Sequence, residues 1–238
     1  IDTYDLYYMH IILWDDIEQQ IVGAYRLCRT RYFYTDPTKP IYTSSLFEYS
    51  SSAEPMLKSG LELGRSFVQE RYWGSRSLDY LWLGIAAFLR RHPEYRYLLG
   101  AVSISNDLSL PAKELLVGFY RKYYGHYGDT QNSEKIQCKK PFEMSEKGQL
   151  HVDELFSELD HKQGFIVLKK QLRYLGYAVP VLYKQYTELT DKGVDYISGK
   201  DNPDFFVLPE IGIEIAKIEE QGLDTEQEAA LKEELFKD

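Results

Sequence analysis

The sequence GLELGRSFVQERYWGSRSLDYLWLGIAAF, residues 60–88, decides the fold. Residues 61–68 are rich in Leu, Phe and Val and predict a strand, while residues 78–88 repeat apolar side chains at helical spacing. Ser77 is placed to cap that helix, and Asp79 stands in its first turn. The stretch therefore predicts a strand, a loop and an amphipathic helix in direct succession.

The loop between this strand and this helix has the character of an anion site. A helix N-terminus presents free N–H groups and positive potential, and Arg71 and Arg76 add positive charge. Any strand–loop–helix unit shares part of this pattern, so the loop alone does not distinguish a binding site from a structural connection. Glu62 favours a site, because a carboxylate within an apolar strand is costly unless it is paired.

Composition indicates a globular protein with a large aromatic content. The chain has 238 residues, of which 44% are hydrophobic and 15% aromatic, with 21 Tyr and 11 Phe. A net charge of −9 argues against non-specific binding of nucleic acid. Cys28 and Cys138 make no disulfide framework and suggest a reducing compartment. The five histidines lack metal-ligand spacing, so we expect no metal site.

The chain shows no sign of a membrane span or of a signal peptide. No apolar run approaches the roughly 20 residues that a spanning helix needs. We therefore expect a cytoplasmic protein, with peripheral contact at the inner face of the cell membrane as an option. The acidic, aromatic start at Ile1 suggests a fragment whose true N-terminal segment is missing.

The remaining elements predict an α/β fold with a mixed sheet. Strands 10–14 and 21–28 form an antiparallel hairpin, and residues 34–55 form a long loop that packs as a lid and holds a short helix at 45–48. The further expected elements are strand 95–104, helix 109–124, helices 152–159 and 164–175 (with Gly176 at its C-terminal cap), strands 177–186 and 204–208, and an acidic helix at 225–238. We divide the chain into a domain at 1–210 and a helical appendage at 211–238.

Three features together resemble a known family: Glu62-Leu63-Gly64-Arg65 on the central strand, Asp2 and Asp5 upstream, and the hairpin strand VGAYRL at 22–27. They are similar to the GNAT-related N-acyltransferases, which include acyl-homoserine-lactone synthases, long-chain N-acyl amino acid synthases and the "hemolysin-like" acyltransferases that make ornithine and glycine lipids in bacteria. The resemblance covers about residues 1–206 and is closest to the ornithine-lipid type. It implies a GNAT fold, a twisted mixed sheet flanked by helices.

The resemblance also implies an activity. A fatty acyl group, of the long-chain 3-hydroxy type, would pass from acyl carrier protein to the amine of an amino acid such as ornithine or glycine in aminolipid synthesis. No cofactor would be bound permanently, since the donor carries its own phosphopantetheine, on acyl carrier protein or on coenzyme A. The loop at 72–77 has one glycine and a bulky Trp73, which suits the single phosphodiester of the carrier protein. The family's N-terminal residues for docking the carrier protein are absent, so the choice of donor stays open.

Site residues follow from the same resemblance. Glu62 would orient or deprotonate the attacking amine, directly or through water, with Arg65 as the second catalytic residue. Substrate binding is expected from Asp2, Asp5, Arg26 and Ser66. Acyl-donor binding is expected from Phe67, Val68, Arg71, Gly74, Ser75, Arg76, Ser77 and Ser103. The alternative for the charged residues is a buried ion network that only stabilises the fold.

Two other functions stand beside this one: a GNAT-like acetyltransferase that uses acetyl-CoA, and a non-catalytic module that binds acyl carrier protein or lipid. A pore-forming toxin has no support, because no amphipathic pore-forming stretch is present.

The catalytic assignment carries a geometric expectation. In a regular strand Glu62 and Arg65 face opposite sides, so a pocket that both serve requires an irregularity. We predict a bulge within 64–67, which frees a backbone N–H for the thioester oxygen, and a divergence of this strand from strand 95–104 that admits the pantetheine arm.

Overall fold

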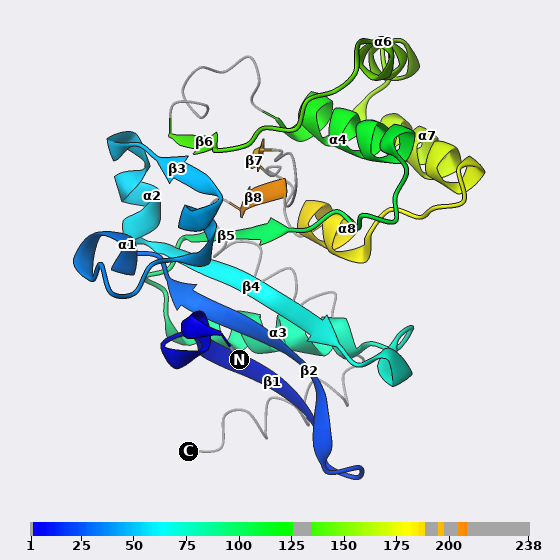
Figure 1. The fold of residues 1–238 in the computed structure, drawn as a ribbon. Helices are drawn as coiled ribbons and strands as arrows, with labels where there is room; N and C mark the ends of the chain where they lie inside the picture. The colour runs from blue at the N-terminus through cyan, green and yellow to red at the C-terminus, as the bar shows by residue number, and fades with distance from the viewer. Residues whose placement is uncertain (1, 126–134, 189–194, 198–203, 209–238) are drawn as a thin grey trace. The chain divides into compact units, whose positions relative to one another are not determined.

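The computed structural model describes residues 2–125, 135–188, 195–197 and 204–208 (Figure 1). Contacts divide the chain into two compact units. Unit 1 contains the described residues of 1–42 and 56–98, and unit 2 contains those of 43–55 and 99–208. Both units combine helices with strands, so the predicted α/β class is confirmed.

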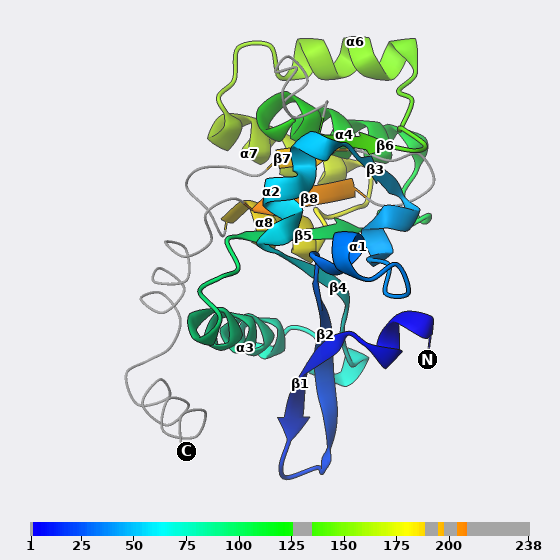
Figure 2. The same cartoon turned by 90° about the vertical axis from the view of Figure 1, so that its left-hand side faces the viewer.

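Unit 1 is built on three antiparallel strands. Strands β1 (Met9–Asp15) and β2 (Gln20–Arg29) form the predicted hairpin, and β4 (Gly60–Val68) pairs with the other edge of β2. Helix α3 (Ser77–Arg91) contacts β1 and β2. In Figure 2, α3 lies on one side of these strands and the dark-blue segment 2–8 lies on the other. The sheet of unit 1 therefore has a helix-covered face and a second face, which we call the outer face.

The helix-covered face holds the core of unit 1. Tyr25 packs edge-on against Trp82 of α3, with 5.9 Å between the ring centroids. Leu27 and Leu63 are almost fully buried on the same face, and burial of each leucine contributes about 1.5–3 kcal/mol. The alternation of residues along the strands leaves every second side chain of β2 and β4 for the outer face.

The predicted bulge is present in β4. Arg26 pairs with Gly64, and Ala24 pairs with Phe67. Between these two pairs β2 has one residue and β4 has two, so β4 contains one extra residue. Arg65 lies in this extra length and has a φ of +44°, in the left-handed region. A bulge whose first residue is left-handed usually has glycine there. Here an arginine takes that conformation.

The start of α3 differs from the prediction in detail. Ser77 is the first residue of the helix, and Arg76 occupies the N-cap position without capping through its side chain. Ser75 supplies the cap instead, because its Oγ accepts from the Ser77 N–H at 3.2 Å. Asp79 lies in the first turn, as predicted. Ser75, two residues earlier, thus accepts the hydrogen bond at the helix start that was expected of Ser77.

The remaining elements of unit 1 are short. They are the 3-10 helices η1 (Thr3–Leu6), η2 (Tyr42–Ser45) and η4 (Glu70–Tyr72), the helices α1 (Tyr32–Thr35) and α2 (Glu54–Lys58), and strand β5 (Tyr97–Val102). Three of them (η2, α2 and β5) span the chain positions at which the two units are divided.

Unit 2 is mainly helical. Its elements are β3 (Phe47–Tyr49), η3 (Ser51–Ala53), α4 (Leu110–Tyr124), β6 (Ile136–Cys138), α6 (Glu146–Leu155), α7 (His161–Tyr174), α8 (Val181–Glu188), β7 (Asp195–Ile197) and β8 (Asp204–Leu208). Helices α6 and α7 contact α4. Aromatic rings fill this core: Phe119, Tyr120, Phe156 and Tyr183 are fully buried.

Several predictions for unit 2 are confirmed. Helix α4 follows Ser109 and has Pro111 in its first turn, and strand 204–208 is present as β8. Gly176 follows α7 with a φ of +85°, which suits glycine. Helix α7 begins earlier than predicted, at His161, because Asp160 and Gln163 form a capping box.

Three other predictions are wrong. Residues 181–188 form helix α8 where a strand at 177–186 was expected; Pro180 precedes the helix directly, and its fixed φ and missing N–H suit a helix start. The helix expected at 45–48 is absent, since Phe47–Tyr49 pairs as β3 with the distant β6. The helix expected at 152–159 lies at 146–155. The helix expected at 225–238 and the appendage at 211–238 lie outside the described residues.

The close approach of β2 and β4 yields a stability prediction. A Cβ on Gly23 would lie 2.5 Å from the carbonyl oxygen of Phe67, a backbone atom that cannot move aside cheaply. Gly23→Ala should therefore lower the free energy of unfolding by about 1–3 kcal/mol in urea titration. Gly64→Ala is the matched control, since a Cβ there meets nothing within 4 Å, and its cost should stay below about 0.5 kcal/mol. Equal costs would contradict this reading.

Candidate active site

Three rows of side chains cross the outer face of unit 1. In antiparallel strands, residues that pair directly share a face, so the register gives the rows. They are Cys28 with Glu62; His10 with Arg26 and Gly64; and Ile12 with Ala24 and Phe67. Glu62 is 1% exposed, whereas Ile12 and Phe67 are 53% and 48% exposed. The outer face therefore changes from a buried acid, through charged residues, to exposed apolar side chains.

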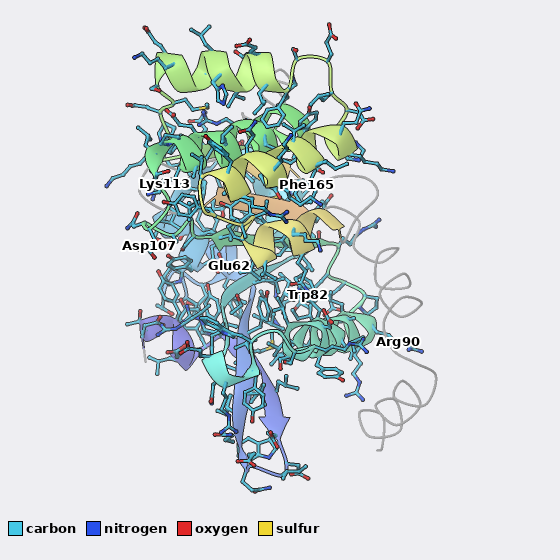
Figure 3. All side chains as sticks on the ribbon, turned by 90° about the vertical axis from the view of Figure 1, so that its right-hand side faces the viewer. Glu62, Trp82, Arg90, Asp107, Lys113 and Phe165 are labelled. Carbon is cyan, nitrogen blue, oxygen red and sulfur yellow. The ribbon has the colours of Figure 1, made fainter. Side chains whose placement is uncertain are left out.

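Glu62 is buried but hydrogen-bonded. The Tyr8 hydroxyl donates to its Oε2 atom, and the Tyr42 backbone N–H donates to the same oxygen at 3.0 Å. The Tyr42 N–H also reaches the Tyr8 hydroxyl, at 2.8 Å. Glu62, labelled in Figure 3, belongs to β4, and its two partners come from parts of unit 1 that are distant from it in sequence. The expectation that this carboxylate must be paired is met by hydrogen bonds, which lower the cost of burial.

An ion network lies next to Glu62. Arg26, 5% exposed, bonds to Asp2 at 2.7 Å and to Asp5 at 2.8 Å. Arg65 bonds to Asp2 at 2.5 Å, and His10 Nε2 lies 3.5 Å from Asp5. Hydrogen bonds from Arg26 hold the pKa of both aspartates below the usual range. The network joins the 2–8 segment to β2 and to the bulge.

The bulge brings together the two predicted catalytic residues. Because β4 has one extra residue at Arg65, this side chain reaches Asp2 on the same face as Glu62. Ser66 lies beside Arg65 in the bulge and is half-buried. Open space lies over Gly64, between the two, since a Cβ there would meet nothing within 4 Å. Asp2, Arg26 and Arg65 are therefore joined on the face that also carries Glu62, and the roles expected of these four residues stay predictions.

The predicted donor residues lie together in the loop before α3. Arg71 and Arg76 are each 46% exposed; Arg71 lies 3.8 Å from Glu18, and Arg76 lies 3.5 Å from Asp79. Gly74 has a φ of +77°. The loop is joined to the hairpin by the Tyr72 hydroxyl, which donates to Asp15 at 2.6 Å. An exposed loop with two cations fits anion binding.

The other residues expected to bind the acyl donor differ in their surroundings. Ser75 Oγ is engaged inside the loop, with the Tyr72 carbonyl at 2.6 Å and Ser77 Oγ at 2.7 Å. Phe67 and Val68 end β4, and the Val68 carbonyl accepts from the indole N–H of Trp73 at 2.9 Å. Ser103 follows β5 and belongs to unit 2. The proposed divergence of β4 from strand 95–104 concerns both units and stays a prediction.

Tyr8 and the Tyr42 N–H are functional candidates that sequence reasoning missed. Tyrosine is the commonest aromatic residue in this chain, so one tyrosine near the start carries no distinguishing pattern. The Tyr42 contact uses the backbone and has no signal in the sequence at all. The available hint was Glu62 itself, because a buried carboxylate requires donors from somewhere in the fold.

Cys28 does not have the environment of a nucleophile. Cys28 lies opposite Glu62, and burial together with the negative charge of Glu62 raises the pKa of Cys28 to about 12. Cys138 lies in β6 of unit 2. Within the described residues no group of three or more His, Cys, Asp and Glu side chains is arranged to hold a metal ion. The same part of the chain has no helix with the length and apolar character needed to cross a membrane.

Comparison with known families agrees with this geometry. Residues 1–83, which carry the hairpin, β4 and the start of α3, match the model of the acetyltransferase (GNAT) domain. Residues 1–83 are therefore similar to a GNAT domain. The resemblance and the fold class expected from the sequence are confirmed.

Curated relatives extend the similarity beyond the GNAT domain. A glycine N(alpha)-acyltransferase of Phocaeicola vulgatus is 29% identical over 206 residues, which cover 80% of this chain and 60% of that protein. An L-ornithine N(alpha)-acyltransferase of Brucella abortus is 33% identical over 98 residues, 39% of this chain and 34% of that protein. The chain thus spans about 60% of the length of the glycine acyltransferase. No solved structure matches.

One similarity is of another kind. A stretch of 51 residues, 21% of this chain, is 67% identical to the protein translocase subunit SecA of Christiangramia forsetii and covers 5% of that protein. Nothing in the sequence patterns that indicated an acyltransferase pointed to it.

The two cysteines should differ strongly in reactivity. With a pKa of about 12, Cys28 is a thiolate in about one molecule in ten thousand at pH 8, and it is also buried. In the native protein one thiol, that of Cys138, should therefore react quickly with Ellman's reagent. The thiol of Cys28 should react only after unfolding in guanidinium. The variant C138S should lose the fast phase and C28S should keep it. Two fast thiols in native protein would contradict the burial of Cys28.

Proposed function

We propose that this protein is an N-acyltransferase that transfers a long-chain fatty acyl group from a carrier-bound thioester to the amine of an amino acid. The observation that carries the proposal is the bulge at Arg65, which sets Glu62 and Arg65 on one face around the open space over Gly64. The GNAT domain and the acyltransferase relatives support it. Glycine and ornithine, which those relatives' names contain, are the acceptors we propose to test first.

The proposed chemistry is a direct transfer. The acceptor amine attacks the thioester carbonyl, a C–N bond forms, the C–S bond breaks, and the thiol leaves with a proton. Glu62 takes the proton that the amine loses, through a water molecule because Glu62 is 1% exposed, and the same proton then passes to the departing sulfur, which leaves as the thiol. A backbone N–H that the bulge turns out of the ladder stabilises the oxyanion.

Arg65 is the group we propose for the acceptor's carboxylate. It is 55% exposed, and its contact with Asp2 shows that a carboxylate can reach it on the outer face. Arg26 is buried under the same network and holds Asp2 and Asp5 in place. An amino acid bound through its carboxylate to Arg65 would lie with its amine toward the open space over Gly64.

For the donor we propose acyl carrier protein, with its phosphopantetheine phosphodiester at the loop before α3. Arg71 and Arg76 are exposed there and can meet a single phosphate. The 3-hydroxy acyl chain, the role in aminolipid synthesis, the cytoplasmic location and contact with the inner membrane surface belong to the same proposal. Nucleic acid has no place in it, given the net charge of −9.

The catalytic role of Glu62 is tested by Glu62→Gln. The amide keeps a carbonyl for Tyr8 and Tyr42, so the fold should survive, while loss of the base should lower acyl transfer by roughly 10²-fold or more. The assay mixes acyl carrier protein thioesters with a panel of amino acids and detects the N-acyl product by mass. Glu48→Gln, on an exposed residue of β3, is the control. Unchanged transfer at neutral pH would make Glu62 structural, and no product from the wild type would favour a binding module.

The donor site is tested by Arg76→Ala. A phosphate contact binds ground state and transition state alike, so the apparent donor KM should rise more than kcat falls. Asp79→Asn is the matched control, because it removes the 3.5 Å ion pair and leaves Arg76 in place. Equal use of acetyl-CoA by the wild type would contradict the choice of acyl carrier protein and favour an acetyltransferase.

A further inference from the structure

The proposed mechanism leaves one buried polar side chain of the site without a role. Tyr8, between η1 and β1, is 5% exposed, and its hydroxyl points at the carboxylate of Glu62. A tyrosine that only filled space would not need this contact. Removal of the hydroxyl would leave a buried carboxylate with one fewer donor, which is costly.

The hydroxyl is held from both sides. It has one proton, which it donates to Glu62 Oε2, and it accepts from the Tyr42 N–H at 2.8 Å. The Tyr42 N–H is a donor and cannot accept the hydroxyl proton, so this proton points away from Tyr42 and toward the Glu62 carboxylate. The same N–H lies 3.0 Å from Oε2, so all three groups meet at one point.

The ring is held as firmly as the hydroxyl. Tyr4 packs edge-on against Tyr8 with 5.7 Å between the centroids, and Tyr7 lies 5.3 Å away. The guanidinium carbon of Arg26 lies over the Tyr8 ring at 5.1 Å. A cation over the ring and an anion at the hydroxyl fix the tyrosine between the ion network and Glu62.

From this arrangement we infer that Tyr8 is a positioning residue: it fixes the orientation of the Glu62 carboxylate and supplies it with a permanent hydrogen-bond donor. The inference rests on the proposed function, in which Glu62 accepts a proton. Burial and the nearby charge of Glu62 raise the pKa of Tyr8 far above neutrality, so the phenol stays a donor at every working pH.

Three other side chains near Glu62 in the described part of the chain do not have this role. Cys28, across the strand pair, has a raised pKa and remains a neutral thiol. Tyr7 interacts with the charge of Glu62, but its hydroxyl donates to the carbonyl of Pro40. Arg26 is occupied by Asp2 and Asp5. Of these side chains, the hydrogen bond to the carboxylate comes from Tyr8.

The test is Tyr8→Phe, which removes one oxygen atom. The maximal kcat should fall about 10-fold while the KM values for both substrates change less than about 2-fold, because Tyr8 is 5% exposed and is given no substrate contact in the proposed mechanism. The acid limb of the kcat profile should move to higher pH by about one unit, since a carboxylate that loses a donor keeps its proton more readily. Tyr7→Phe is the matched control: it deletes a hydroxyl that bonds elsewhere in the same segment, and its profile should stay in place.

A double-mutant cycle separates positioning from a general structural role. If Tyr8 acts through Glu62, Tyr8→Phe should have no further effect on kcat in a Glu62→Gln background. An additional 10-fold loss in that background would overturn the inference, as would an unmoved acid limb in the single variant. A loss equal to that of Tyr7→Phe would do the same.

A readout without activity keeps this inference separate from the proposed function. The side-chain carboxyl of Glu62 can be followed by carbon NMR in protein with labelled glutamate, assigned through Glu62→Gln. Its titration midpoint should be about one pH unit higher in Tyr8→Phe than in the wild type and unchanged in Tyr7→Phe. Equal midpoints would overturn the role of Tyr8 even if transfer is seen. A shifted midpoint without transfer would support it while the proposed function fails.

Discussion

A carboxylate buried inside a sheet is the constraint on which the rest of unit 1 depends. Glu62 is almost completely buried, so water cannot solvate its carboxylate, and the hydrogen-bond donors that stabilise the charge must come from the protein. Two such donors are the Tyr8 hydroxyl and the backbone N–H of Tyr42, which lie far from β4 along the chain. These two hydrogen bonds hold the 2–8 segment and the first residue of η2 against β4. The ion network around Arg26 then holds the same segment from its other end.

The bulge is the second consequence of placing charge on this face. Arg65 has a left-handed backbone, which costs a non-glycine residue about 1 kcal/mol or more. In a regular strand the Arg65 side chain would face α3, and the strained backbone at this position turns it to the outer face instead. The ion pair with Asp2 offsets part of this cost, and the neighbouring Gly64 leaves room above the strand. Strain, charge and open space thus occur at consecutive residues, as is common where a protein binds or transforms a ligand.

Sequence reasoning reached the parts of this structure that depend on side-chain chemistry at known spacing. Glu62 and Arg65 could not both serve one pocket from a regular strand, and that contradiction predicted the bulge. What it missed depends on partners far along the chain. Strand β3 exists because β6 pairs with it, and Tyr42 contributes a backbone N–H. The helix at 181–188 was mistaken for a strand because apolar and aromatic residues outweighed the signal of Pro180.

Asp2 has a further consequence for how the site would select a ligand. It bridges Arg26 and Arg65, so the chain already places a carboxylate of its own on the exposed guanidinium. An incoming amino acid must compete with this tethered group, whose effective concentration is in the millimolar range for a short connection. A carboxylate alone would compete poorly. A ligand whose amine gains its own contact near Glu62 would displace Asp2, so the tether would act as a filter for molecules that carry both groups.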